Sequence, residues 1–231
     1  MKNARHVAGF LAALVLSAPL VFAQSNGPLE EVLTKMDEAA SHFRSTEADF
    51  VWDQYQKVVD ETDTQKGRIY FRRTGGEVQM AADIREPEPK YLLFADSKIQ
   101  IYQPRIDQVT VYDTGKNRGE VESFLVLGFG GRGHDMLKSF DVKYLGTEKL
   151  GDLQTAKLEL VPKSQKVRNN FDHFVLWIDP ERGISVQQQL FEPSGDYRLA
   201  KYSNIRIDQK IADSVFKIKT TGKTKTVSPS S

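Results

Sequence analysis

The sequence contains no cysteine, so it can form neither a disulfide, nor a cysteine nucleophile, nor the lipid-modified cysteine of a lipoprotein. An excess of charge of one sign is also lacking, since 32 lysines and arginines balance 31 aspartates and glutamates, for a net charge of +1. So little net charge exerts no long-range attraction on nucleic acid, and we expect no nucleic-acid partner. Without disulfides, the stability of the protein must come from its hydrophobic core.

Long apolar runs are confined to the N-terminus. Lys2 and Arg5 precede an almost wholly apolar run over residues 7–16, and Pro19 and Ala23 follow it. This order is typical of a secretory signal peptide, with cleavage expected after Ala23. The run is shorter than the roughly 20 apolar residues that a membrane-spanning helix needs. We therefore expect residues 1–23 to direct export and the mature chain to be free in the export compartment.

Hydrophobic periodicity predicts one helix followed by many strands. Apolar residues recur at helical spacing from Pro28 to Phe43, which predicts an amphipathic helix of about four turns. From Thr46 the spacing changes to two, and Thr74-Gly75-Gly76 has the composition of a hairpin turn. Strands are predicted at 46–53, 68–73, 78–84, 90–95, 99–102, 109–112, 140–144, 156–160, 171–178, 184–191, 197–202 and 205–207.

The middle of the chain breaks this series. A short apolar helix is predicted over 121–127, and a second helical turn begins near Met136. Between them Gly128, Gly130 and Gly133 spell G-x-G-x-x-G, but a dinucleotide site needs this motif inside a parallel βαβ unit. The antiparallel surroundings favour a flexible hinge that lets the apolar helix swing over a cavity mouth.

These patterns predict an α+β fold with a single domain, in which a strongly curved antiparallel sheet forms an incomplete β-barrel. The expected division is a signal peptide at 1–23, one domain at 24–219 and a polar, mobile C-terminal tail at 220–231. Some strands, such as 171–178, are apolar on both faces. Two interpretations stay open: a well-packed barrel covered by helices, or a barrel with an unfilled hydrophobic cavity for an apolar ligand.

Catalytic and metal-binding motifs are scarce. The chain has four histidines, and neither H-E-x-x-H nor G-x-S-x-G occurs. His134 precedes Asp135, and we expect this pair in a solvated loop, with His173 as a wall residue of a strand. We therefore predict that the protein is not an enzyme and has no metal site and no cofactor.

Arg72 and Arg73 stand where a predicted strand approaches its turn. Arginines in this position are usually solvent-exposed residues at the end of a strand. A guanidinium here can alternatively donate hydrogen bonds to backbone carbonyls of a covering helix, which would hold a lid shut without a counter-charge.

Several short stretches, in this order along the chain, resemble the LolA family of periplasmic outer-membrane lipoprotein carriers. They are FRSTEADF at 43–50, GRIYFRR at 67–73, IQIYQP at 99–104 with 108–109, LELVPK at 158–163, the segment 196–204, and Val215-Phe216. The resemblance implies helical lids over a hydrophobic cavity. It also implies a carrier that receives a lipoprotein from an inner-membrane ABC-type release complex and delivers it to an outer-membrane acceptor.

The resemblance assigns roles to particular residues. The family's lid-gating arginine falls on Arg73, but the proline that commonly follows it is Thr74 here, so Arg72 stays an alternative. The residues expected to line the lipid-binding cavity are Phe50, Trp52, Val78 and Met80 on strands, with Phe124, Leu127 and Phe129 on the lid.

Three functions follow from the resemblance. The first is a monomeric periplasmic carrier that binds lipoprotein acyl chains and shuttles them from the inner to the outer membrane. The second is a similar carrier of another lipid, such as a glycolipid or a polyprenyl-linked intermediate. The third is a periplasmic protein that senses lipoproteins and regulates a membrane partner.

Overall fold

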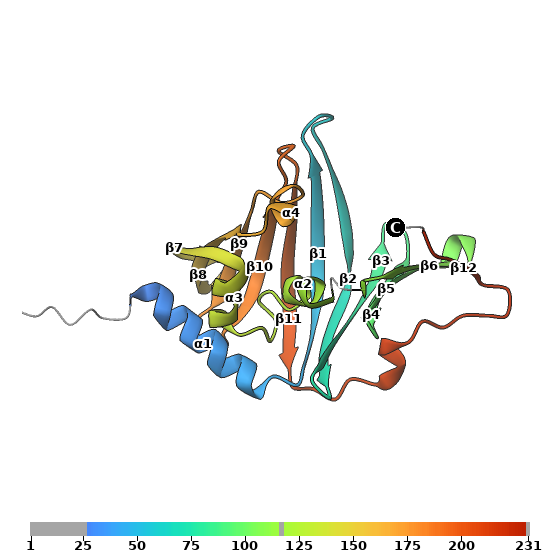
Figure 1. Ribbon diagram of the computed structural model, residues 1–231, viewed down its shortest axis with the longest axis horizontal. Coiled ribbons are helices and arrows are strands. Elements are labelled where there is room, and N and C mark those ends of the chain that lie inside the picture. The colour runs from blue at the N-terminus through green and yellow to red at the C-terminus, as the bar shows by residue number, and fades with distance from the viewer. Residues whose placement is uncertain (1–26, 116–117, 230–231) are drawn as a thin grey trace, which may run out of the picture.

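The computed structural model describes residues 27–115 and 118–229, and the predicted signal peptide lies outside them. Twelve strands form one sheet in the order β12-β6-β5-β4-β3-β2-β1-β11-β10-β9-β8-β7 (Figure 1). They are β1 (Ser45–Gln56), β2 (Glu61–Thr74), β3 (Glu77–Glu86), β4 (Lys90–Ala95), β5 (Lys98–Gln103), β6 (Gln108–Asp113), β7 (Phe140–Leu150), β8 (Leu153–Pro162), β9 (His173–Asp179), β10 (Ile184–Phe191), β11 (Tyr197–Ile207) and β12 (Lys225–Val227). The helices are α1 (Pro28–His42), α2 (Arg118–Leu125), α3 (Gly133–Ser139) and α4 (Gln165–Arg168), with short 3-10 turns η1 (Pro104–Ile106) and η3 (Asp213–Phe216).

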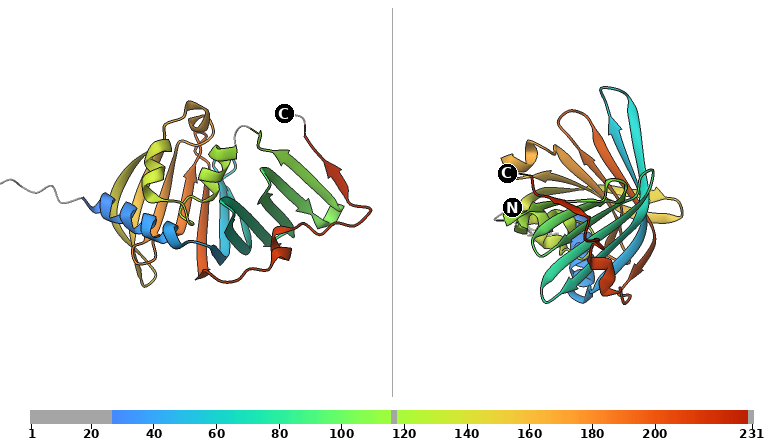
Figure 2. Two further views of the ribbon diagram at one scale, coloured as in Figure 1. Left: turned by 60° about the horizontal axis from the view of Figure 1, so that its bottom comes forward. Right: turned by 90° about the vertical axis from the view of Figure 1, so that its right-hand side faces the viewer.

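The sheet curls strongly but does not close, because β7 and β12 remain at its two edges. The views in Figure 2 show α1, α2 and α3 on one side of the curved sheet. We call this side the concave face and the opposite side the convex face. The predicted α+β fold with an incomplete antiparallel barrel is therefore confirmed.

Helix α1 forms as its sequence predicts. Pro28 occupies the first turn, where its missing N–H costs nothing, and Glu30 and Glu31 lie at the positive end of the helix dipole. The buried stripe of the helix packs on the concave face and consists of Val32, Leu33, Met36 and Ala40. The turn between β9 and β10 passes so close that a Cβ on Gly183, where φ is +62°, would lie 2.5 Å from the Lys35 carbonyl oxygen.

Two hydrophobic clusters divide the concave face. The first lies under α1, on β7 to β9, and includes Leu158, Leu160 and Leu176, each with no exposed surface. The second lies on β1 to β4 and includes Phe50, Phe71, Met80 and Phe94. A smaller third cluster lies on the convex face, where Phe216 packs against Ala81, Leu93 and Ala95.

The C-terminal segment differs from the expected mobile tail. Within residues 220–229, β12 pairs in parallel with β6, and this is the one parallel pair among the described strands. Asp107 secures it, because its carbonyl oxygen accepts a hydrogen bond from the Lys225 amide at 2.9 Å and its carboxylate accepts one from Thr224 Oγ1 at 2.9 Å. The segment is polar, as expected, but three of its residues are part of the sheet.

The segment at 171–178 also begins later as a strand than predicted. The amide of Phe171 still donates to the Val167 carbonyl at 2.9 Å, so the turn of α4 extends to this residue and β9 starts at His173. Among the helices of the described residues, none combines the length and the apolar composition needed to cross a membrane.

Candidate functional site

The segment from α2 to the glycine-rich turn crosses the concave face between its two hydrophobic clusters. We call residues 118–132 the lid segment. Phe124 contacts the first cluster, with ring centroids 5.8 Å from Phe140 and 5.5 Å from Phe174. Phe129 enters the second cluster, where it stacks on Phe71 at 4.9 Å and meets the edge of Tyr202 at 4.7 Å. The lid segment thus places one aromatic ring in each half of the barrel.

Three donors from the sheet hold the lid segment by its backbone carbonyls. Gln188 Nε2 donates to the Leu127 oxygen at 2.5 Å, and the Ser185 amide donates to the Gly128 oxygen at 2.8 Å. Arg73 Nη2 donates to the Gly130 oxygen at 3.0 Å. Because all three acceptors are neutral, opening the lid segment separates no ion pair at these contacts.

Two glycines allow the lid segment to approach the sheet this closely. Gly128 has φ of +81°, and a Cβ there would lie 2.4 Å from Ser185 Cβ. Gly130 has φ of +74°, and a Cβ there would lie 2.4 Å from the ring of Phe43. Any larger side chain would therefore push the lid segment off the sheet as well as strain its turn. In this structure the glycines allow close packing against the sheet, and their role as a hinge stays a prediction.

Arg72 and Arg73 point to opposite faces of β2, as neighbours on a strand must. Arg73 faces the concave side and contacts the lid segment, with its guanidinium 5.9 Å from the ring centroid of Phe43. Arg72 faces the convex side, where it donates to Gln79 Oε1 at 3.1 Å, pairs with Asp213 and lies 4.2 Å from the ring centroid of Phe216. Of the two candidates, Arg73 is the one placed to act on the lid segment, and its gating role stays a prediction.

The seven residues predicted to line the cavity all lie on the interior side, and six of them belong to the two hydrophobic clusters or pack against them. Phe50, Met80 and Phe129 belong to the second cluster, and Trp52 packs against it with its ring 4.0 Å from that of Phe50. Leu127 belongs to the first cluster, with Phe124 packed against it. Val78 is buried beside the Arg73 end of the lid segment. Whether these side chains contact a lipid stays a prediction.

Open space adjoins α2 on both sides. A hollow of about 460 Å³ lies between α2, α3 and the β2–β3 hairpin, where its lining includes Arg73, Val78 and Leu127. A second hollow of about 570 Å³ lies toward α4, and its lining includes Phe124, Phe140 and Val167. The aromatic rings of the lid segment occupy the middle of the concave face, and the hollows that border the segment are lined by both apolar and charged residues.

Two polar residues of the site, Ser185 and Gln188, were missed by the sequence analysis. The inward position of Gln188 follows from its register opposite Leu176, a core residue. Its Oε1 also lies 3.4 Å from the hydroxyl of Tyr202, whose pKa burial raises above its usual range. The sequence does contain a signal for this residue, a glutamine at an inward position of a strand. The inward position can be recognised only once the strand register is known.

His134 ties α3 to α1. Its Nδ1 lies 2.8 Å from Asp37 Oδ2, and its Nε2 lies 3.0 Å from Glu30 Oε1. The hydrogen bond with Asp37, followed by the one with Glu30, raises the pKa of His134. Burial acts to raise the pKa of Asp37, but the hydrogen bonds and charge of His134 prevail and lower it. The expectation of a solvated loop is therefore wrong, because His134 is part of α3 and bridges two carboxylates of another helix.

A curved antiparallel sheet whose concave face is apolar and covered by a lid segment defines a class of binding and carrier proteins. The chain belongs to the LolA family, since the family described as outer membrane lipoprotein carrier protein LolA matches residues 41–219. This confirms the resemblance on which the sequence analysis relied. The members of this family are carrier or binding proteins.

Solved structures share the fold at low sequence identity. MucB is 13% identical with a TM-score of 0.52, and the match covers 83% of this chain and 62% of MucB, so this chain spans less than two thirds of that protein. A conserved protein from Thermus thermophilus is 11% identical with a TM-score of 0.54, and the match covers 87% and 98% of the two chains. No protein of curated function matches the sequence. At these identities the likeness shows the fold alone.

The contact of Arg73 can be tested by hydrogen exchange of the lid segment. Arg73→Leu removes a charged donor, and such a hydrogen bond contributes about 1.5–3 kcal/mol. We expect amide exchange in residues 126–131 to become about tenfold faster or more. Arg72→Leu is the matched control, because it removes the neighbouring guanidinium from the convex face. Equal exchange in the wild type and Arg73→Leu would contradict a role for Arg73 in holding the lid segment.

The bridge at His134 predicts a pH-dependent stability. A histidine whose folded-state pKa is raised stabilises the fold fully below its unfolded pKa of about 6.5, and this contribution is lost as the pH rises through the folded pKa. We expect the wild type to lose thermal stability relative to His134→Gln as the pH rises above about 6.5 and through the raised pKa of His134. Asp37→Asn should weaken the same dependence. Parallel melting curves for the wild type and His134→Gln across this range would refute the linkage.

Proposed function

We propose that this protein is a periplasmic carrier that binds the acyl chains of lipoproteins on its concave face and shuttles them from the inner to the outer membrane. The observation that carries this proposal is the placement of Phe124 and Phe129. Each ring fills an apolar site of the barrel while belonging to a segment held by hydrogen bonds to neutral carbonyls. Another apolar group can take the place of these rings, although opening the whole segment also separates the ion pairs Arg118–Glu77 and Arg132–Asp37.

Exchange of lid for ligand also suits the energetics of a carrier. Each buried CH₂ group of an acyl chain contributes about 0.8 kcal/mol, so full burial of several chains in an open cavity would bind too tightly for release. A lid segment that competes for the same apolar surface lowers the net affinity by the free energy of its own displacement. The binding is then strong enough for transport and weak enough for delivery.

The partners follow from the family description of a lipoprotein carrier. We infer that an inner-membrane ABC-type complex loads the protein and that an outer-membrane acceptor unloads it, with the carrier acting as a monomer. The predicted signal peptide at 1–23 supports a periplasmic location, and the absence of cysteine means that the chain cannot itself be anchored as a lipoprotein.

Native mass spectrometry of the protein purified from the periplasm of a Gram-negative host tests the proposal directly. We expect a complex whose added mass matches a triacylated lipoprotein. A bound small lipid would instead favour a carrier of another lipid. An empty protein that also ignores added acyl ligands would contradict the carrier function and favour a regulatory role.

The cavity itself is tested by Trp52→Glu. An unpaired carboxylate on the apolar concave face costs several kcal/mol, so the affinity for a fluorescent fatty-acid probe should fall at least tenfold. Val51→Glu is the matched control, because Val51 faces the convex side of the same strand, between Lys66 and Lys201 on the neighbouring strands. Undiminished probe binding by a folded Trp52→Glu variant would show that Trp52 does not contact the ligand.

A further inference from the structure

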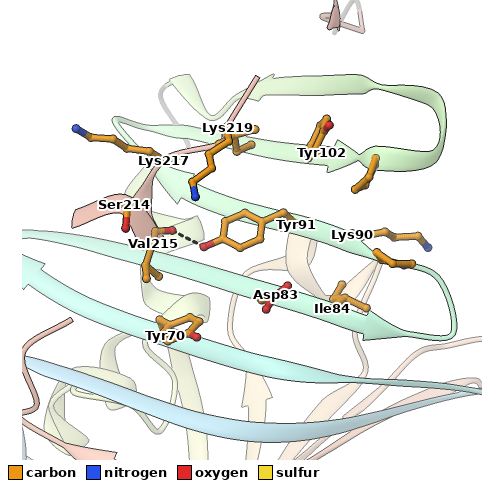
Figure 3. Close-up of a pocket in the computed structure, with 13 residues that line it drawn as sticks. Tyr70, Asp83, Ile84, Lys90, Tyr91, Tyr102, Ser214, Val215, Lys217 and Lys219 are labelled. Atoms are coloured by element: carbon orange, nitrogen blue, oxygen red, sulfur yellow. Dashed lines mark hydrogen bonds between the residues drawn. The ribbon is translucent and has the colours of Figure 1, made fainter. Parts of the chain in front are cut away.

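A second recess lies on the convex face, separated from the concave face by the sheet itself. Strands β2, β4 and β5 supply Tyr70, Tyr91 and Tyr102 to it, and the chain after β11 supplies its other wall with Val215 and Ile218 (Figure 3). Its volume is about 390 Å³. We call this recess the tyrosine groove.

The tyrosines present their rings to the groove while two of their hydroxyls are already bonded. The hydroxyl of Tyr91 donates to the Val215 carbonyl, and that of Tyr102 donates to Asp107 Oδ1 at 3.2 Å. Burial raises the pKa of Tyr91 to about 12, so this side chain is neutral. The rings are therefore fixed apolar walls, a composition that suits extended peptides.

Three lysines and one carboxylate, that of Asp83, line the groove, and Lys217 also interacts electrostatically with Asp213. Lys90, Lys217 and Lys219 line it, and none of them forms an ion pair within 4.0 Å among the described residues. Figure 3 shows Lys219 turned toward Tyr91, with Lys90 and Lys217 extending to opposite sides. The carboxylates in and around the groove each pair with an arginine: Asp83 with Arg85 at 2.9 Å, Glu88 with Arg105 at 2.6 Å, and Asp213 with Arg72.

One wall of the groove also offers free backbone groups. Lys217 is extended, with φ of −143° and ψ of 129°, and the segment 217–219 forms no hydrogen bond within the described part of the chain. Unpaired N–H and C=O groups of an extended segment are the pattern that another extended chain can bind by strand addition.

We propose that the tyrosine groove binds an extended, acidic segment of a partner protein. Carboxylates of the segment would pair with Lys90, Lys217 and Lys219, its backbone would bond to residues 217–219, and its apolar side chains would contact the tyrosine rings. A lipid headgroup satisfies the lysines but leaves the backbone groups of 217–219 unbonded, so the peptide is the better match. This groove is separate from the proposed acyl-binding site, so peptide binding here does not depend on which cargo the concave face binds.

The test uses fluorescence anisotropy of the full-length mature protein with a labelled octapeptide that alternates glutamate and proline. We expect it to bind more tightly than the matching glutamine–proline and lysine–proline peptides, with an affinity that falls as salt is added. Lys219→Glu combined with Lys90→Glu should weaken binding at least tenfold. Lys223→Glu, an exposed lysine outside the groove lining, should leave it unchanged.

A second variant tests the aromatic wall of the groove without changing its charge. Tyr102→Leu removes one aromatic wall without altering the lysines, and should also weaken binding of the glutamate peptide. Equal affinity for the glutamate and glutamine peptides, or equal loss in the groove and Lys223 variants, would overturn the proposal. So would binding of phosphatidylglycerol vesicles through Lys90 and Lys219 with no binding of the peptide, because the groove would then face a membrane.

Discussion

The anchoring of a short apolar segment on the concave face is the constraint on which the rest of this structure depends. Phe129 is almost fully buried on the concave face of the sheet, and the carbonyls on either side of it accept hydrogen bonds from Gln188, Ser185 and Arg73. A curved sheet with an apolar concave face must be covered by something, and here the chain covers it with its own middle segment. The close approach of Gly128 and Gly130 to the sheet makes this possible.

The same strand serves both faces of the sheet. Because side chains alternate along β2, Arg73 reaches the lid segment while Arg72 reaches Asp213 and Phe216 on the other side. Two adjacent residues of one strand therefore contact the lid segment on the concave face and the C-terminal segment on the convex face. The segment that Arg72 secures is also the one that forms a wall of the tyrosine groove.

Much of the fold was predictable because its signals are local. The apolar stripe after Pro28 predicted α1, and Thr74-Gly75-Gly76 predicted the turn between β2 and β3. The contacts that complete the site join distant residues: Gln188 lies 61 positions from Leu127, and His134 lies 97 from Asp37. Strand β12 was missed because its three residues, Lys225 to Val227, are too few to carry a periodic signal, and only its position beside β6 makes it a strand.

The order of the strands has a consequence for how the molecule forms. The half of the sheet from β1 to β6 joins the half from β7 to β11 only where β1 pairs with β11, with Thr46 opposite Ile207. No continuous sheet can exist until the ribosome has made nearly the whole chain. Because such distant pairings must close a long loop before they stabilise anything, folding is expected to be slow compared with a helical protein of this size. Until β11 is made, the two halves, each of which pairs strands that are adjacent in sequence, are therefore not joined to each other through the sheet.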